Sequence, residues 1–127
     1  MNISSKIFIY VLMMYYLFQF KSYEIKQLER FIERQRKKLD SRYYCKYVLA
    51  KFVDRNLKKI LGSDICFVRS YICVMLLKRY GYAPSLYIGA YENEDNLSSH
   101  AWVKEGDDIL FESKDAISNY NVLTVFK

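Results

Sequence analysis

The sequence is short of the residues on which several common functions depend. Its 127 residues include one proline, four glycines and one histidine, and its three cysteines follow no regular spacing. An odd number of irregularly spaced cysteines argues against a disulfide framework and favours a reducing cytoplasm. The chain has no glycine-rich phosphate loop, no metal-ligand cluster, no internal repeat and no low-complexity linker. We therefore expect no bound cofactor.

The composition is that of one folded domain. Hydrophobic residues make up 52% of the chain and aromatic residues 17%, which excludes a disordered protein. The length allows a single core, so we expect one domain over residues 1–127, with a helical part at 1–60 and a catalytic core at 61–127. The net charge of +6 is spread along the chain rather than clustered, so we expect no nucleic-acid partner.

An almost unbroken apolar run of fourteen residues, 7–20, lies near the start of the chain. A spanning helix needs about 20 apolar residues, so we do not expect a membrane segment. The apolar region of a signal peptide is similarly short and remains an alternative, although no small-residue cleavage site follows and Lys21 begins a charged stretch. The run favours a helix that is buried or that docks on a partner.

Two further helices are expected before residue 62. Residues 21–39 carry apolar side chains near helical spacing among many charges, which predicts an amphipathic surface helix. Asp40 or Ser41 can cap the next helix, and its apolar stripe places Cys45 in the core. That stripe consists of Tyr44, Cys45, Val48, Leu49, Phe52, Val53, Leu57, Ile60 and Leu61. The charged residues opposite are most simply a solvated face, with peptide docking as a minority alternative.

The last third of the chain changes from helix to strand. A helix over 65–80 follows Gly62-Ser63-Asp64, a helix-start signal, and ends before Gly81. Strands are predicted at 86–91, 100–104 and 109–112, with a polar loop at 92–99 and a turn at 105–108. Helices followed by a small antiparallel sheet make an α+β fold.

Cys66 and the only histidine, His100, are the candidate catalytic pair. Cys66 lies in the first turn of its helix, where unpaired backbone N–H groups and the helix dipole favour thiolate over thiol. This position suits a nucleophile. The alternative is that Cys66 is simply a small buried hydrophobic residue.

Four segments together resemble the lasso-peptide leader peptidase family. They are Cys66-Phe67-Val68-Arg69, Leu76-Leu77-Lys78-Arg79-Tyr80-Gly81, Tyr87-Ile88-Gly89-Ala90 and His100-Ala101-Trp102-Val103, with an acid twelve residues after the histidine. The similarity is close over residues 60–120 and looser upstream. It implies a papain-like, transglutaminase-like fold with a Cys-His-Asp triad and the catalytic cysteine at a helix N-terminus.

The resemblance assigns Cys66 as nucleophile, His100 as general base and acid, and Glu112 as the group that orients the imidazole. Glu112 departs from the aspartate usual in the family. Glu112 and His100 share a face of the sheet if residues 105–107 form a three-residue loop. A two-residue turn at 106–107 would instead set Ala101 opposite Glu112. In that case a bulge could restore the pairing with His100. Other acids nearby are poorer candidates because they lie in the turn or past the strand: Asp107, Asp108 and Asp115.

Two other side chains near the predicted site, those of Arg69 and Trp102, have two interpretations each. Arg69 either supports the site and its substrate or forms a surface salt bridge. Trp102 is a wall beside the imidazole or a plain core residue. Cys73 is too far along the helix for a disulfide with Cys66 and is expected to be packed in the core. Zinc bound by the three cysteines and His100 has no support from their spacing.

The resemblance implies a cysteine peptidase that removes the leader from a lasso-peptide precursor before an asparagine-synthetase-like cyclase closes the ring. With no strand-rich opening segment, this chain resembles the form of the enzyme that works with a separate small leader-binding protein. Two other classes stay open. One is a transglutaminase or deamidase using the same Cys66 and His100, and the other is a non-enzymatic module that docks through the aromatic N-terminal helix.

Overall fold

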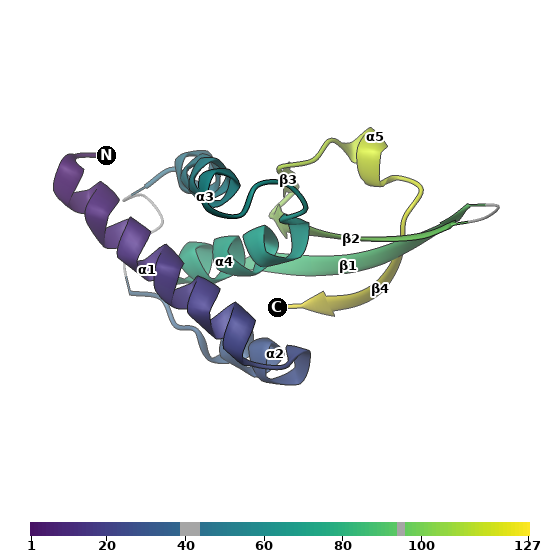
Figure 1. Ribbon diagram of the computed structural model, residues 1–127, viewed down its shortest axis with the longest axis horizontal. Coiled ribbons are helices and arrows are strands. Elements are labelled where there is room, and N and C mark those ends of the chain that lie inside the picture. The colour runs from purple at the N-terminus through teal and green to yellow at the C-terminus, as the bar shows by residue number, and fades with distance from the viewer. Residues whose placement is uncertain (39–43, 94–95) are drawn as a thin grey trace.

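The computed structural model describes residues 1–38, 44–93 and 96–127. In this part of the chain, helices come first and an antiparallel sheet follows (Figure 1), so the predicted α+β class is confirmed. The helices are α1 (Ile3–Ser22), α2 (Ile25–Arg34), α3 (Lys46–Leu61), α4 (Cys66–Arg79) and the short α5 (Lys114–Ile117). The strands are β1 (Pro84–Asn93), β2 (Asn96–Glu105), β3 (Asp108–Leu110) and β4 (Asn121–Phe126).

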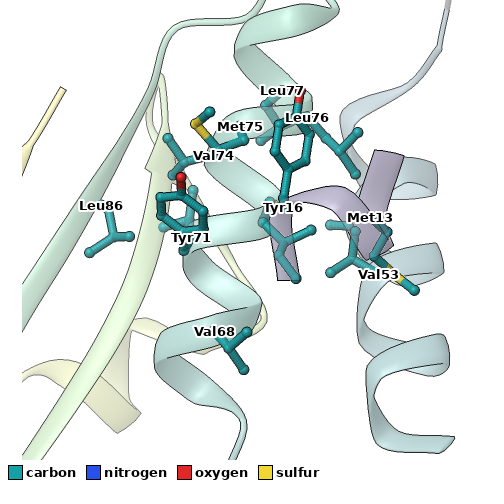
Figure 2. Close-up of a cluster of buried hydrophobic side chains, with 14 of the residues drawn as sticks. Met13, Tyr16, Val53, Val68, Tyr71, Val74, Met75, Leu76, Leu77 and Leu86 are labelled. Atoms are coloured by element: carbon teal, nitrogen blue, oxygen red, sulfur yellow. The ribbon is translucent and has the colours of Figure 1, made fainter. Parts of the chain in front are cut away.

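Helix α4 is the centre of the core. Its sequence is apolar on nearly every side, and a helix of that kind is stable only when neighbours surround it. Nine of its residues are buried, and α1, α3 and the sheet pack around them. Figure 2 shows Met13 and Tyr16 of α1, Val53 of α3 and Leu86 of β1 meeting the side chains of α4. Cys66 therefore begins the helix with the most buried residues among those that the structure describes.

The sheet has the order β3-β2-β1-β4, and each neighbouring pair is antiparallel. The predicted polar loop at 92–99 is wrong, because β1 continues to Asn93 and β2 begins at Asn96. The β1–β2 hairpin extends away from the helices (Figure 1), so the residues at its polar end are mostly exposed. They therefore lack the alternation of buried and exposed residues that marks a half-buried strand. Strand β4 has no counterpart among the strands predicted from the sequence.

The second helix is shorter than predicted. Instead of one helix over 21–39, α1 continues to Ser22 and α2 spans Ile25–Arg34. Between them, the Glu24 backbone N–H donates a 3.0 Å hydrogen bond to the Gln27 side chain, which begins a new helix in a new direction. Leu28 and Ile32 are its buried residues, in agreement with an amphipathic helix.

Helix α3 begins later than its predicted apolar stripe. Cys45 is the residue before the helix and is exposed, so the prediction that Cys45 lies in the core is wrong. The helix begins at Lys46, and its buried face consists of Leu49, Ala50, Val53 and Leu57. The predicted caps Asp40 and Ser41 lie outside the described residues.

Helix α1 extends beyond the apolar run of 7–20 and has 20 residues. By length and composition alone it could cross a membrane, so the shortness of the apolar run does not exclude a membrane span. One side of the helix is part of the core, through Ile9, Met13, Tyr16 and Leu17. The buried Tyr71 hydroxyl of α4 also donates a 3.0 Å hydrogen bond to Gln19. The opposite side is exposed and apolar, so only one side of the helix is buried in the fold.

Candidate active site

Cys66 and His100 line the same cavity, although 34 residues separate them in sequence. The cavity has a volume of about 300 Å³ and lies where the beginning of α4 meets the β1–β2 hairpin. Its other lining residues are Phe20, Asp64, Phe67, Val68, Ile88, Ser99 and Ala101. The walls are mostly apolar, with the thiol and the imidazole as the reactive groups. The fold thus brings together the two residues predicted as nucleophile and base.

Cys66 is the first residue of α4, as predicted, and is partly exposed. The preceding segment is a tight turn in which Gly62 and Asp64 have positive φ angles of 79° and 63°. The N-cap residue is Ile65, and no side chain caps the helix. Gly62-Ser63-Asp64 therefore turns the chain but does not cap the helix. With no side-chain cap at this end of the helix, the Cys66 backbone N–H is a candidate donor to a developing oxyanion.

His100 and Glu112 form the shortest contact of the site. His100 Nε2 lies 2.6 Å from Glu112 Oε1, and their side chains are 21% and 18% exposed. This contact fixes the orientation of the ring and occupies Nε2. The other ring nitrogen, Nδ1, is then the one left to exchange a proton with a thiol.

Glu112 reaches His100 because the chain leaves the strand at Phe111. The turn is the two-residue one, with Glu105 paired to Asp108 and Val103 paired to Leu110. Continued pairing would set Glu112 opposite Ala101, but β3 ends at Leu110 and the strand predicted to 112 is too long. Phe111 has a φ of 72°, which is rare for a bulky residue and turns the chain out of the sheet. With a two-residue turn, a bulge was one way to bring Glu112 to His100, and the turn of the backbone at Phe111 does this instead.

Arg69 connects the acid of the site to α3. Its guanidinium is 2.7 Å from Asp54 Oδ1 through Nη1 and 3.5 Å from Glu112 Oε1 through Nη2. It also lies 4.3 Å from the centre of the Phe111 ring. The Arg69 side chain is only 11% exposed, so this is not a surface salt bridge. Burial alone would raise the pKa of Asp54, but hydrogen bonds and charges from Arg69 and Lys58 outweigh it and lower that pKa.

Trp102 lies beside the imidazole and is almost fully buried. The ring centres of His100 and Trp102 are 6.3 Å apart at an interplanar angle of 23°, and Tyr120 packs against both rings. Gly89, opposite His100 in the sheet, makes room for this arrangement, because a Cβ there would lie 2.8 Å from Trp102. Trp102 is therefore both a wall beside the imidazole and a buried core residue, as the two interpretations proposed.

The remaining candidates lie away from the cavity. Cys73 is buried within α4, and burial raises the pKa of its thiol. Asp108 is paired with Lys46 at 2.6 Å in the distant turn, and Asp115 is exposed at the start of α5. Within residues 1–38, 44–93 and 96–127, no group of three or more His, Cys, Asp or Glu side chains could hold a metal ion.

Three residues of this site were not predicted from the sequence. Asp54 was counted with the solvated face of its helix, and Tyr120 was in a segment for which nothing was predicted. Gly89 was named only as part of the Tyr87-Ile88-Gly89-Ala90 motif, with no role of its own. A glycine in the middle of a strand is itself a signal of a close approach, and Gly89 could have been found that way.

In this α+β fold, a cysteine at a helix N-terminus shares a cavity with a histidine on the sheet, and a carboxylate just past the sheet contacts that histidine. This arrangement defines a class of thiol acyl-transfer proteins. Comparison with family models agrees with this class: the model described as the transglutaminase-like superfamily matches residues 32–125. The chain belongs to that superfamily, which includes cysteine proteases and acyl transferases. None of the curated proteins and none of the solved structures compared with the chain matches it.

Proposed function

We propose that the chain is a cysteine peptidase that removes the leader from a lasso-peptide precursor. The observation that carries this proposal is the 2.6 Å contact between His100 and Glu112 on the cavity that Cys66 also lines. Membership of the transglutaminase-like superfamily supports the thiol chemistry. The four motifs that resemble leader peptidases support the choice of substrate.

The reaction follows from the positions of these groups. Nδ1 of His100 accepts the thiol proton, and the Cys66 sulfur attacks the carbonyl carbon of the scissile bond. The Cys66 backbone N–H donates to the resulting oxyanion. The intermediate collapses as the C–N bond breaks, and the imidazolium gives its proton to the leaving amine. Water then attacks the thioester with His100 as base, which releases the leader as an acid and restores the thiol.

The proposed partners come from the same resemblance. The substrate is a precursor peptide that carries a leader, and a separate small leader-binding protein presents it to the cavity. A cyclase similar to asparagine synthetase acts on the product. We place these steps in the cytoplasm, where the free thiol of Cys66 persists.

Product identity tests this function against the alternatives. The chain is incubated with precursor and leader-binding protein, and the peptides are weighed by mass spectrometry. We expect two fragments that together exceed the precursor by one water. An intact precursor that gains an amine or shifts by about one dalton would instead show a transglutaminase or deamidase. An unchanged precursor that nevertheless binds the chain would show a non-enzymatic docking protein.

A further inference from the structure

The contacts behind Glu112 continue to α3, which contributes no lining residue to the Cys66 cavity. Arg69 holds Asp54 at 2.7 Å but reaches Glu112 only at 3.5 Å, so its guanidinium is attached mainly to α3. Asp54 is 25% exposed and Arg69 11% exposed, which limits the screening of this pair by solvent. Asp54 therefore decides where the positive charge of Arg69 lies.

That position matters because two groups share one oxygen of Glu112. His100 Nε2 lies 2.6 Å from Glu112 Oε1, and Arg69 Nη2 lies 3.5 Å from the same oxygen. A guanidinium without a competing partner forms short two-pronged pairs with carboxylates. Such a pair would draw Glu112 away from the imidazole. Because Nη1 of Arg69 is paired with Asp54, only Nη2 is directed at Glu112, and the distance between Arg69 and Glu112 stays long.

Arg69 also acts on the turn that delivers Glu112. Its guanidinium covers the ring of Phe111, whose backbone is in the left-handed region at φ 72°. A bulky residue keeps such a conformation only when its surroundings hold it there. A displaced Arg69 would remove one of those supports, and Glu112 follows directly in the chain.

We propose that Asp54 is a positioning residue of this site, which holds the Arg69 guanidinium at the distance that leaves Glu112 directed at His100. The inference rests on the proposed function, since Glu112 matters only if His100 is the catalytic base. It adds an element, α3, to the parts of the fold on which turnover depends.

Three variants test the role of Asp54 in turnover. Asp54→Asn removes the negative charge that holds Arg69. Arg69→Lys keeps the positive charge but replaces the planar guanidinium by a single ammonium group. Asp108→Asn is the matched control, because Asp108 is also an ion-paired aspartate with a lowered pKa but lies outside the site. For Asp54→Asn and Arg69→Lys we expect kcat to fall about tenfold with KM nearly unchanged, as for a misplaced catalytic group. The control should match the unaltered protein.

A spectroscopic readout separates this inference from the choice of substrate. The chain has one histidine, so every imidazole N–H signal in its proton NMR spectrum comes from His100. In the unaltered protein we expect a low-field Nε2–H signal protected from exchange by Glu112. It should weaken or move in both variants and stay in the control, whether or not the chain is a leader peptidase. An unchanged signal and an unchanged kcat in folded Asp54→Asn and Arg69→Lys proteins would overturn the role of Asp54.

Discussion

At the scale of single residues, the site depends on backbone positions as much as on reactive groups. Phe111 has no catalytic atom, yet its φ of 72° turns Glu112 toward His100 instead of leaving it in register opposite Ala101. A strained conformation of this kind costs roughly 1–3 kcal/mol and persists where the surroundings hold it. Its position next to the acid suggests that the strain is retained for the geometry of the site.

Glu112→Gln tests the acid of the site. The amide can occupy the same space but lacks the charge that supports an imidazolium, so turnover should fall by about tenfold to a hundredfold. That loss is smaller than the loss expected for Cys66→Ala and larger than for Asp108→Asn, and Glu112→Asp should retain activity. Rates are measured as kcat/KM on the precursor. If Glu112→Gln and the unaltered protein had equal rates, Glu112 would not be the group that orients His100.

Gly89→Ala tests the packing behind the imidazole. The added Cβ would lie 2.8 Å from the Trp102 ring and 3.0 Å from the backbone oxygen of Asn121, so the ring or β4 must move. We expect a lower melting temperature and a turnover reduced by more than the loss of folded protein explains. Gly106→Ala is the control: it is strained by its φ of 62° but has open space around it. Full specific activity of Gly89→Ala would show that the position of Trp102 is unimportant.

At the scale of elements, α1 has two different sides. Ile9, Met13, Tyr16 and Leu17 are buried in the core, where each contributes about 1.5–3 kcal/mol by hydrophobic burial. The other side exposes a row of large apolar residues: Ile3, Ile7, Phe8, Tyr10, Val11, Met14, Tyr15 and Phe18. Exposed apolar surface of this extent is typical of interaction sites. The helix is thus part of the fold, and its outer side is a candidate interface.

Deletion of residues 1–20 should remove both properties. We expect insoluble protein, because the buried side of α1 completes the core around α4, or a folded protein that no longer binds its partner. Phe18→Ser separates the two cases, since Phe18 is 67% exposed and its loss should leave the fold intact while weakening partner binding. Solubility and co-purification with the leader-binding protein are the measurements. A soluble truncated chain that cleaves the precursor without a companion would contradict both expectations.

At the scale of the whole molecule, the sequence predicted the parts that depend on local chemistry. The start of α4 at Cys66, the strand around His100 and the helix-then-sheet order follow from apolar periodicity and turn residues, and all three are confirmed. The exposure of Cys45 was missed because the apolar stripe does not mark the residue at which a helix begins. The turn at Phe111 and the contact between Asp54 and Arg69 depend on packing between distant segments, which no local pattern records.

We propose that Cys66 is the nucleophile of a site in which His100 and Glu112 act together. The most direct measurement is mass spectrometry of the precursor after incubation with Cys66→Ala, with the unaltered chain and Cys45→Ala as controls. Because Cys45 is exposed and outside the cavity, its variant should cleave normally. We expect no fragments from a Cys66→Ala protein whose melting temperature shows that it is folded. Cleavage by that protein at a rate close to that of the unaltered chain would show that Cys66 is not the nucleophile.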